Sequence, residues 1–142
     1  MSQVRDLLQN RPVFHVEENQ TVAAAARRMA ELKVGAILVL EKGELRGVFS
    51  ERDLMVRVVI EKLDPERTPV GQVMSTALET VEETASLEQA MEKMRAHSCR
   101  HLPVLRESSV VGFLSMRDLM HHELEIKTDE VRHMRAYIQS SQ

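Results

Sequence analysis

Hydrophobic residues recur at spacings of three and four in two separate stretches of the chain. They occupy Val22, Ala25, Ala26, Met29 and Leu32 in the first stretch, and Leu87, Ala90, Met91, Met94 and His97 in the second. This period matches the 3.6 residues of a helical turn, so each stretch predicts an amphipathic helix with one apolar face.

Two short apolar runs follow each of these helices. They cover residues 36–40 and 45–50 in the first half of the chain, and 101–105 and 110–115 in the second. Runs of this length, separated by polar turn residues, predict buried strands joined as a hairpin. A second helix is expected after each hairpin, from about residue 51 to 62 and from residue 116 to about 124.

The two halves of the chain are related as an internal repeat. Sliding the sequence by 65 residues aligns them without a gap, and 13 of the 40 positions from Val16 to Met55 are identical. The longest matches are Val16–Glu18 with Val81–Glu83 and Arg52–Met55 with Arg117–Met120. A shift of 66 also aligns the leading segments, residues 4–8 and 70–74. A repeat of this size indicates two equivalent structural units.

The order strand, helix, strand, strand, helix therefore occurs twice, which predicts an α/β (α+β) fold with a C-terminal helix. The predicted divisions are a first motif over 1–63, a linker over 64–69, a second motif over 70–125 and a C-terminal helix and tail over 126–142. Neither half has enough apolar surface to form a stable hydrophobic core of its own. The two sheets are therefore expected to pack face to face about a pseudo-twofold axis, with ligand-sized clefts between them.

The C-terminal segment predicts a further helix that begins at Thr128. Thr128 can cap it, acidic residues follow in the first turn, and Val131, Met134 and Tyr137 or Ile138 form an apolar stripe. Such a stripe needs a surface to pack on. Two alternatives stay open, its own domain and a second subunit.

A Gly-x-x-Ser-x-Arg-Asp sequence occurs once in each unit, where a strand ends and a helix begins. The two copies are Gly47–Asp53 and Gly112–Asp118. Free N–H groups at a helix start favour an anion, so the Ser hydroxyl and the Arg guanidinium can hold a phosphate. The Asp carboxylate would repel a phosphate but can accept hydrogen bonds from two adjacent ribose hydroxyls. Ser-x-x-Asp also resembles a capping box, which needs no ligand, and both interpretations can hold together.

This duplicated signature resembles that of the cystathionine β-synthase (CBS) domain family. Val34–Val39 and Arg100–Val104 add to the resemblance, which spans residues 1–125. It implies that the two motifs form one flat module, that modules commonly dimerise, and that clefts between motifs bind AMP, ADP, ATP, NAD or S-adenosylmethionine.

The resemblance also implies roles for individual residues. Asp53 and Asp118 would hold ribose, while Ser50, Ser115, Arg52 and Arg117 would approach phosphates. The backbone of Val16, Gly35, Ala36, His101 and Leu102 would line the adenine pocket. Arg100 and Pro103, which flank His101-Leu102, complete the set of candidate ligand-binding residues.

The two units differ where Gly35-Ala36 of the first corresponds to Arg100-His101 of the second. Because Arg100 and His101 can reach a phosphate, the cleft of Ser115 and Asp118 is expected to be the better nucleotide site. The alternative for Arg100 is a solvated charge in a turn.

Several histidines and Cys99 suggest a metal site at first. His97, Cys99 and His101 are close in sequence, and His121-His122 follows the second signature. Zinc needs three or four converging ligands. A helix face, a turn and a strand start do not provide that convergence, so no metal is predicted.

Composition and charge exclude several classes of protein. The net charge is −3, aromatic residues make up 3% and there is no Trp, which argues against nucleic-acid binding. No apolar run approaches the roughly 20 residues that span a bilayer. The single Cys99 and the lack of a signal-like N-terminus lead us to expect a cytoplasmic protein.

We expect a regulatory protein rather than an enzyme, because the sequence has no P-loop, no Gly-x-Gly-x-x-Gly and no nucleophile with an evident base. The leading hypothesis is a homodimeric sensor of energy or metabolites that binds AMP, ADP or ATP and acts on an unidentified protein partner. One alternative is a sensor of NAD(H) or S-adenosylmethionine. Another is a nucleotide-independent interaction module in which Ser and Asp are only helix caps.

Overall fold

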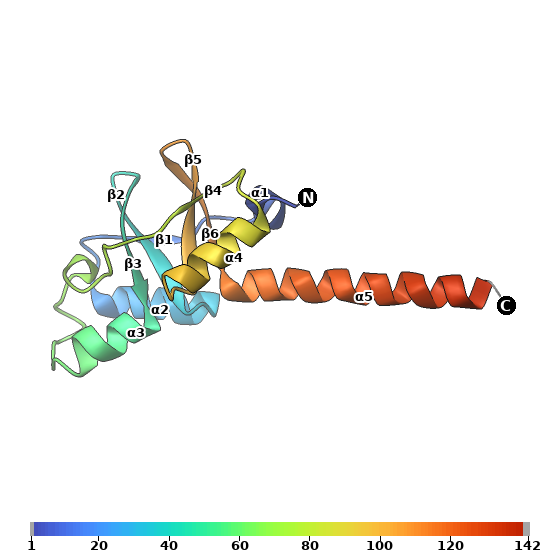
Figure 1. Ribbon diagram of the computed structural model, residues 1–142. Helices are drawn as coiled ribbons and strands as arrows, with labels where there is room; N and C mark the ends of the chain where they lie inside the picture. Colours follow the sequence, from blue (N-terminus) through green and yellow to red (C-terminus); the bar gives the residue numbers. More distant parts are fainter. Residues whose placement is uncertain (1, 141–142) are drawn as a thin grey trace.

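A computed structural model describes residues 2–140 as two similar units followed by one long helix (Figure 1). The first unit comprises α1 (Val4–Leu8), β1 (His15–Glu17), α2 (Val22–Leu32), β2 (Ala36–Glu41), β3 (Glu44–Ser50), α3 (Glu51–Asp53) and the π-helical η1 (Leu54–Val59). The second comprises the 3-10 turn η2 (Val70–Gln72), β4 (Val81–Glu82), α4 (Leu87–Ala96), β5 (His101–Arg106), β6 (Ser109–Ser115) and α5 (Met116–Ser140). The predicted order of strands and helices, and with it the fold class, is confirmed.

Each unit contains a three-stranded sheet of the same topology. β1 pairs parallel with β2, and β2 pairs antiparallel with β3; β4, β5 and β6 repeat this arrangement. The antiparallel register shifts at equivalent points, after Val39 in the first hairpin and after Val104 in the second. The sequence repeat is therefore a structural repeat down to this irregularity.

The leading segments of the two units are exchanged in space. Val4 of α1 is fully buried in the core of the second unit, and its N–H donates to the Ala85 carbonyl at 2.8 Å. Val70 of η2 is fully buried in the core of the first unit, and its N–H donates to the Gln20 carbonyl at 2.8 Å. The boundaries at 63 and 70 thus describe the sequence repeat, whereas each spatial core includes a segment from the other half.

The helix after β3 is shorter and less regular than predicted. It begins at Glu51 as expected, becomes π-helical at Leu54 and ends at Val59, before Lys62. Its outer face carries exposed apolar side chains, among them Met55 and Val59.

Helix α5 runs without interruption for 25 residues. The predicted helix start at Thr128 is wrong: its hydroxyl donates to the Leu124 carbonyl at 2.9 Å, within the helix. No Gly or Pro lies between Met116 and Ser140, so no local signal ends the first helix. The second half of α5 extends away from both units (Figure 1), so its docking on its own domain, one of the two open alternatives, is not observed. None of the helices in residues 2–140 is long and apolar enough to cross a bilayer.

Candidate functional site

Two clefts lie between the units, and each contains one copy of the Ser-x-x-Asp motif. The cleft at Asp118, of about 380 Å³, is lined among others by Arg11, Phe14, Val34, His101, Phe113, Ser115 and Arg117. The cleft at Asp53, of about 1100 Å³, is lined among others by Ser50, Arg52, Arg57, Ser75, Arg100 and Pro103. Ligand sites commonly have volumes of roughly 300–1000 Å³, so both clefts are large enough for a small molecule.

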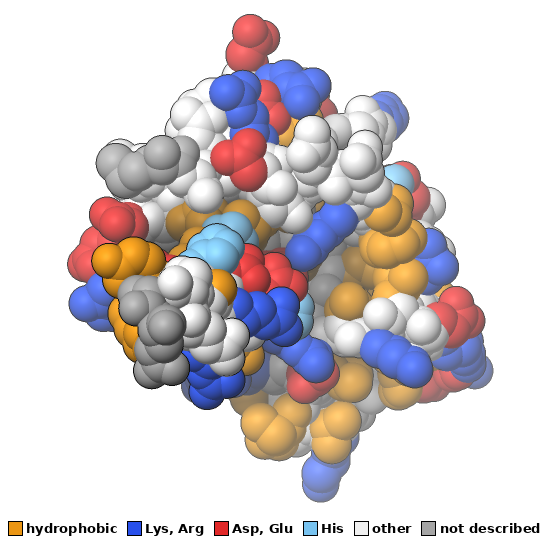
Figure 2. Space-filling view, turned by 90° about the vertical axis from the view of Figure 1, so that its right-hand side faces the viewer, with side chains coloured by type: hydrophobic (Ala, Val, Ile, Leu, Met, Phe, Trp, Pro, Cys, Tyr) orange, Lys and Arg blue, Asp and Glu red, His pale blue; other side chains and the backbone are white. Residues whose placement is uncertain are grey.

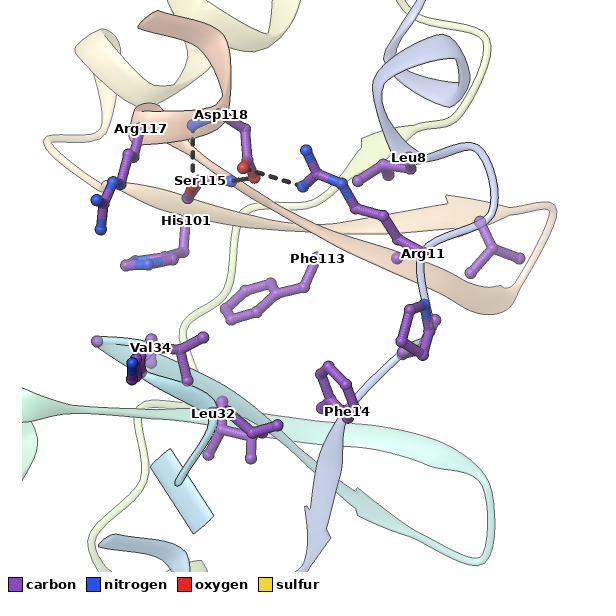
Figure 3. A pocket seen from close by; sticks show the side chains of 18 residues that line it. Leu8, Arg11, Phe14, Leu32, Val34, His101, Phe113, Ser115, Arg117 and Asp118 are labelled. Atoms are coloured by element: carbon purple, nitrogen blue, oxygen red, sulfur yellow. Dashed lines mark hydrogen bonds and ion pairs between the residues drawn. The ribbon is translucent and has the colours of Figure 1, made fainter. Parts of the chain in front are cut away.

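The Asp118 carboxylate is held at the start of α5 by two groups (Figure 3). The Ser115 N–H donates to Oδ2 at 2.9 Å, and the Asp118 N–H donates to Ser115 Oγ at 3.0 Å, which is the geometry of a capping box. Arg11 contacts Oδ1 through its guanidinium at 2.9 Å. An ionised carboxylate has about four acceptor positions, so two remain for a ligand.

These contacts also keep Asp118 ionised. Burial alone would raise the pKa of its carboxyl, but the hydrogen bonds from Ser115 and Arg11 outweigh burial and lower the pKa below its usual value. The charged form therefore stabilises the fold at neutral pH, and that contribution is lost only as the pH falls through the lowered pKa.

A flat apolar surface lies beside this carboxylate. The rings of His101 and Phe113 are stacked, with centroids 5.2 Å apart and an angle of 28° between their planes. Figure 3 shows both rings across the cavity from Leu32 and Val34 of the first unit. Burial lowers the pKa of His101, and the charges of Asp118 and Glu51 only partly oppose this effect. His101 is therefore neutral at pH 7.

We expect His101 to make the stability of the protein dependent on pH. The folded-state pKa of His101 is lowered, so the unfolded chain takes up the proton first, and stability falls as the pH drops below about 6.5. His101→Phe keeps a stacked ring but removes the titration. Its melting temperature is expected to change less than that of the unmodified protein between about pH 6.5 and 5.5.

The control for this measurement is His133→Gln, which removes an exposed histidine from α5. It should keep the full pH dependence of the melting temperature. If the melting temperatures of His101→Phe and of the unmodified protein changed equally with pH, His101 would not be the source of the pH dependence.

The Asp53 carboxylate is buried, and most of its hydrogen-bond acceptor positions are occupied. It accepts hydrogen bonds from Ser50 N–H, Ser50 Oγ and Ser75 Oγ, each at 3.0 Å, and Arg57 Nε lies 3.7 Å from Oδ1. Only 9% of its side chain is exposed, compared with 21% for Asp118. The two motifs are equivalent in sequence, but their carboxylates differ in availability.

Comparison with known proteins identifies the two units. The family model described as CBS domain matches residues 4–60 and again residues 70–125. The chain belongs to the CBS domain family. Proteins of this family are generally regulatory, and a tandem pair of CBS domains accounts for both halves of the chain.

Relatives of similar length share this organisation. CBS domain-containing protein YhcV of Bacillus subtilis is 37% identical over 87% of this chain and 87% of its own. Hypoxic response protein 1 of Mycobacterium tuberculosis is 29% identical over 86% of this chain and 85% of its own.

Solved structures of CBS domain proteins superpose on this fold. A CBS domain protein from Pyrobaculum aerophilum, complexed with AMP, is 31% identical over 82% of this chain and 89% of its own, with a TM-score of 0.75. Hypoxic response protein 1, solved with two coordinated zinc ions, is 29% identical over 86% of this chain and 99% of its own, with a TM-score of 0.73.

The structure brings most of the predicted residues to the clefts, but two of them do not line either cleft. Gly35, Ala36 and His101 line both clefts. Val16 and Leu102 are instead buried in the two cores, 3% and 0% exposed, and line neither cleft. Their side chains lie on the core face of their strands, so any contact with a ligand would have to come from their backbone, which stays a prediction.

The predicted position of Arg100 also needs correction. Arg100 lines the Asp53 cleft, not the Asp118 cleft that it was expected to favour. Arg100 directly precedes β5, which pairs with β6, but it lines the cleft of the other motif. A preference for the Asp118 cleft must therefore rest on its carboxylate and not on Arg100.

Sequence reasoning missed Arg11, Phe113, Arg57 and Ser75. Arg11 and Ser75 follow the two exchanged leading segments, so each meets the aspartate of the unit on which its segment packs. Phe113 lies inside the signature, at an apolar position that was interpreted only as strand. No local signal in the sequence identifies the contacts of Arg11 and Ser75.

The candidate metal ligands do not converge. His97 Nδ1 lies 3.4 Å from Glu79 Oε1, and Cys99 is partly packed against the second core, where burial raises the pKa of its thiol. Over residues 2–140, no group of three or more His, Cys, Asp or Glu side chains is placed to hold a metal ion.

Proposed function

We propose that this tandem CBS pair is a regulatory module that binds an adenine nucleotide, AMP, ADP or ATP, in the Asp118 cleft. The observation that carries the proposal is that one cavity combines a partly free carboxylate, a stacked ring pair and the Arg117 side chain. The AMP complex of the Pyrobaculum aerophilum protein supports this class of ligand.

Asp118 is the proposed ribose ligand. Ser115 and Arg11 use two of its acceptor positions, which leaves room for hydrogen bonds from the 2′- and 3′-hydroxyls. Its ionised state at neutral pH strengthens such bonds, because a hydrogen bond to a charged acceptor is stronger than one between neutral groups.

Arg117 is the proposed phosphate ligand. Its side chain is exposed, lines the Asp118 cleft and has no carboxylate partner among residues 2–140. A phosphate can therefore pair with Arg117 without breaking an existing ion pair. Ser115 Oγ, at the start of α5, adds a hydroxyl donor near the same helix terminus.

The adenine ring is proposed to lie against His101 and Phe113. A neutral imidazole and a phenyl ring offer a flat surface of low polarity, suited to stacking with a base. Gly35 and Ala36, on the facing unit, present little side chain and allow the base to approach their backbone.

The Asp53 cleft is the weaker site in this proposal. Three hydrogen bonds and the nearby Arg57 already occupy the Asp53 carboxylate, so a ribose would have to displace Ser50 or Ser75. Arg52 and Arg100 line this cleft without carboxylate partners in the described chain, which favours an anion there over a diol.

A second copy of the chain and a regulated protein are the proposed partners. Met55 and Val59 are 54% and 64% exposed, and their repeat equivalents Met120 and Leu124 are 63% and 64% exposed. Apolar side chains are visible at the lower edge of Figure 2, at the height of α3 and η1 in Figure 1. Exposed apolar surface of this kind favours association of protein surfaces.

The experiment that tests the proposal is a thermal-shift titration with adenosine, AMP, ADP, ATP, NAD and S-adenosylmethionine. A ligand that binds only the native state raises stability by RT ln(1 + [L]/Kd). We expect the largest shift with AMP, ADP or ATP. Asp118→Ala should weaken the affinity at least about tenfold, because a hydrogen bond to a charged group contributes about 1.5–3 kcal/mol.

The matched control is Asp129→Ala, which removes an exposed aspartate from the free half of α5. It should leave the ligand shift unchanged. Equal shifts in Asp118→Ala and the unmodified protein would contradict the assigned ribose contact. No shift with any compound would favour the nucleotide-independent interaction module, and a shift only with NAD or S-adenosylmethionine would change the ligand class.

A further inference from the structure

The second half of α5 has no apolar surface to cover it within the described chain. Every residue from Glu123 to Ser140 is exposed, although Leu124, Val131 and Met134 are apolar. Figure 1 shows this half of the helix extending away from both units. In proteins, most of the stability of a helix comes from packing of its apolar face rather than from its helix propensity.

Most of the apolar residues follow a seven-residue repeat, and only Ile126 and Tyr137 among the exposed large apolar residues of residues 124–138 lie outside it. Leu124, Lys127, Val131, Met134 and Ile138 alternate at spacings of three and four. This is the pattern of positions a and d in a coiled coil, with Leu124, Val131 and Ile138 at a and Met134 at d. Lys127 is the one charged member, and its long stem can pack along the seam while the ammonium group stays in water.

This stripe does not lie on the side of α5 that packs against the body. Leu119 is 1% exposed and belongs to the second core, whereas Met120, about 100° further around the helix, is 63% exposed. Met120 and Leu124 lie on the stripe side, so the exposed face begins at the body and continues towards the free end.

The charges beside the stripe favour pairing with a second copy of the helix in parallel orientation. Glu130 occupies position g and Arg135 position e of the next heptad, the two positions that meet between parallel helices. Two such Glu130–Arg135 pairs would form in a symmetric dimer. In an antiparallel pair with Leu124 opposite Met134, Glu130 of one copy would instead lie near Glu130 of the other, which is unfavourable.

We propose that residues 124–138 of α5 form a parallel two-stranded coiled coil with the same segment of a second copy. This interface is separate from the nucleotide clefts and adds to any contact between the CBS modules. It fixes both modules at the same end of the coil.

Disulfide trapping in the full-length protein tests the proposal. In a Cys99→Ala background, Met134→Cys brings two thiols together across a parallel, in-register seam, where the distance between Cα atoms suits a disulfide. We expect most of the Met134→Cys chains to become covalent dimers under mild oxidation. Arg132→Cys, on an exposed position outside the stripe, is the matched control and should cross-link several-fold less.

Charge exchange tests the orientation. Glu130→Arg and Arg135→Glu should each weaken the Met134→Cys cross-link and raise the dissociation constant of the dimer about fivefold, and the double variant should restore both. Light scattering measures the assembly of the same samples. A monomer, a dimer without preferential Met134→Cys cross-linking, or a preferred cross-link between Leu124→Cys and Met134→Cys chains would each overturn the proposal.

Discussion

Asp53→Ala is expected to lower the free energy of unfolding by about 3 kcal/mol, because it removes a buried carboxylate and leaves the partly buried Ser50 and Ser75 groups without their acceptor. Asp53 is 6% exposed, and its carboxylate accepts from Ser50 and from Ser75. Arg57, whose guanidinium also donates to the Met74 carbonyl at 2.8 Å, would lose its nearest acidic group.

The effect should be large because Asp53 joins two parts of the fold through a part-buried hydrogen bond to Ser75, whereas Asp118 does so through the half-exposed Arg11. Ser75 belongs to the segment that the second half of the chain contributes to the first core, and Asp53 belongs to the helix of that first unit. The carboxylate therefore stabilises both the helix start and the exchanged segment. Its loss removes contacts that the capping interpretation alone does not include.

Asp118→Ala is the matched control for this stability measurement. Asp118 has the same capping geometry, but its side chain is 21% exposed, compared with 9% for that of Asp53. We expect a loss of about 1 kcal/mol, which is typical of a helix cap. Chemical denaturation without ligand measures both variants. Equal losses would show that the difference in burial between the two carboxylates has no energetic consequence.

Gly47→Ala is expected to destabilise the protein by about 3 kcal/mol, at the upper end of the usual cost of overpacking. A Cβ at Gly47 would lie 2.6 Å from Met74 Sδ and 2.8 Å from the Ser75 carbonyl oxygen. The backbone of Ser75 cannot move away easily, because its N–H and C=O both pair with Val48 at 2.9 and 3.0 Å.

Gly112→Ala, the repeat equivalent, is the matched control. There the nearest atom to the added Cβ is Leu8 Cδ1 at 2.5 Å, and the next, Leu8 Cγ, lies at 3.5 Å. A terminal methyl can rotate away, so a loss of about 1 kcal/mol is expected. Thermal denaturation of both variants provides the comparison. If Gly112→Ala proved as costly as Gly47→Ala, backbone contact would not be the reason for the cost.

The positions of the candidate site could be predicted only in part. The helix starts at Ser50 and Ser115 were correct, because a strand followed by Ser-x-x-Asp is a local signal. The partners of the two aspartates were not predicted. Arg11 and Ser75 are far from Asp118 and Asp53 in sequence, and their contacts depend on which core each leading segment joins.

The C-terminal helix shows a similar limit. Thr128 and the acidic residues after it satisfy the rules for a helix start, and the helix that precedes them has no end signal. A new helix that starts at Thr128 and one continuous helix are both compatible with the local sequence. The continuous α5, with Thr128 hydrogen-bonded inside it, was therefore decided by the three-dimensional structure.

The sequence by itself determined the two-unit organisation, the order of strands and helices and the family, because hydrophobic periodicity and short motifs depend on neighbouring residues. Only the tertiary structure decided the exchange of the leading segments, the cleft that Arg100 lines and the different availability of Asp53 and Asp118. Residues 4–8 and 70–74 have similar apolar patterns, so each fits either core in terms of sequence. Long-range packing selects one arrangement, and with it the residues that share each cleft.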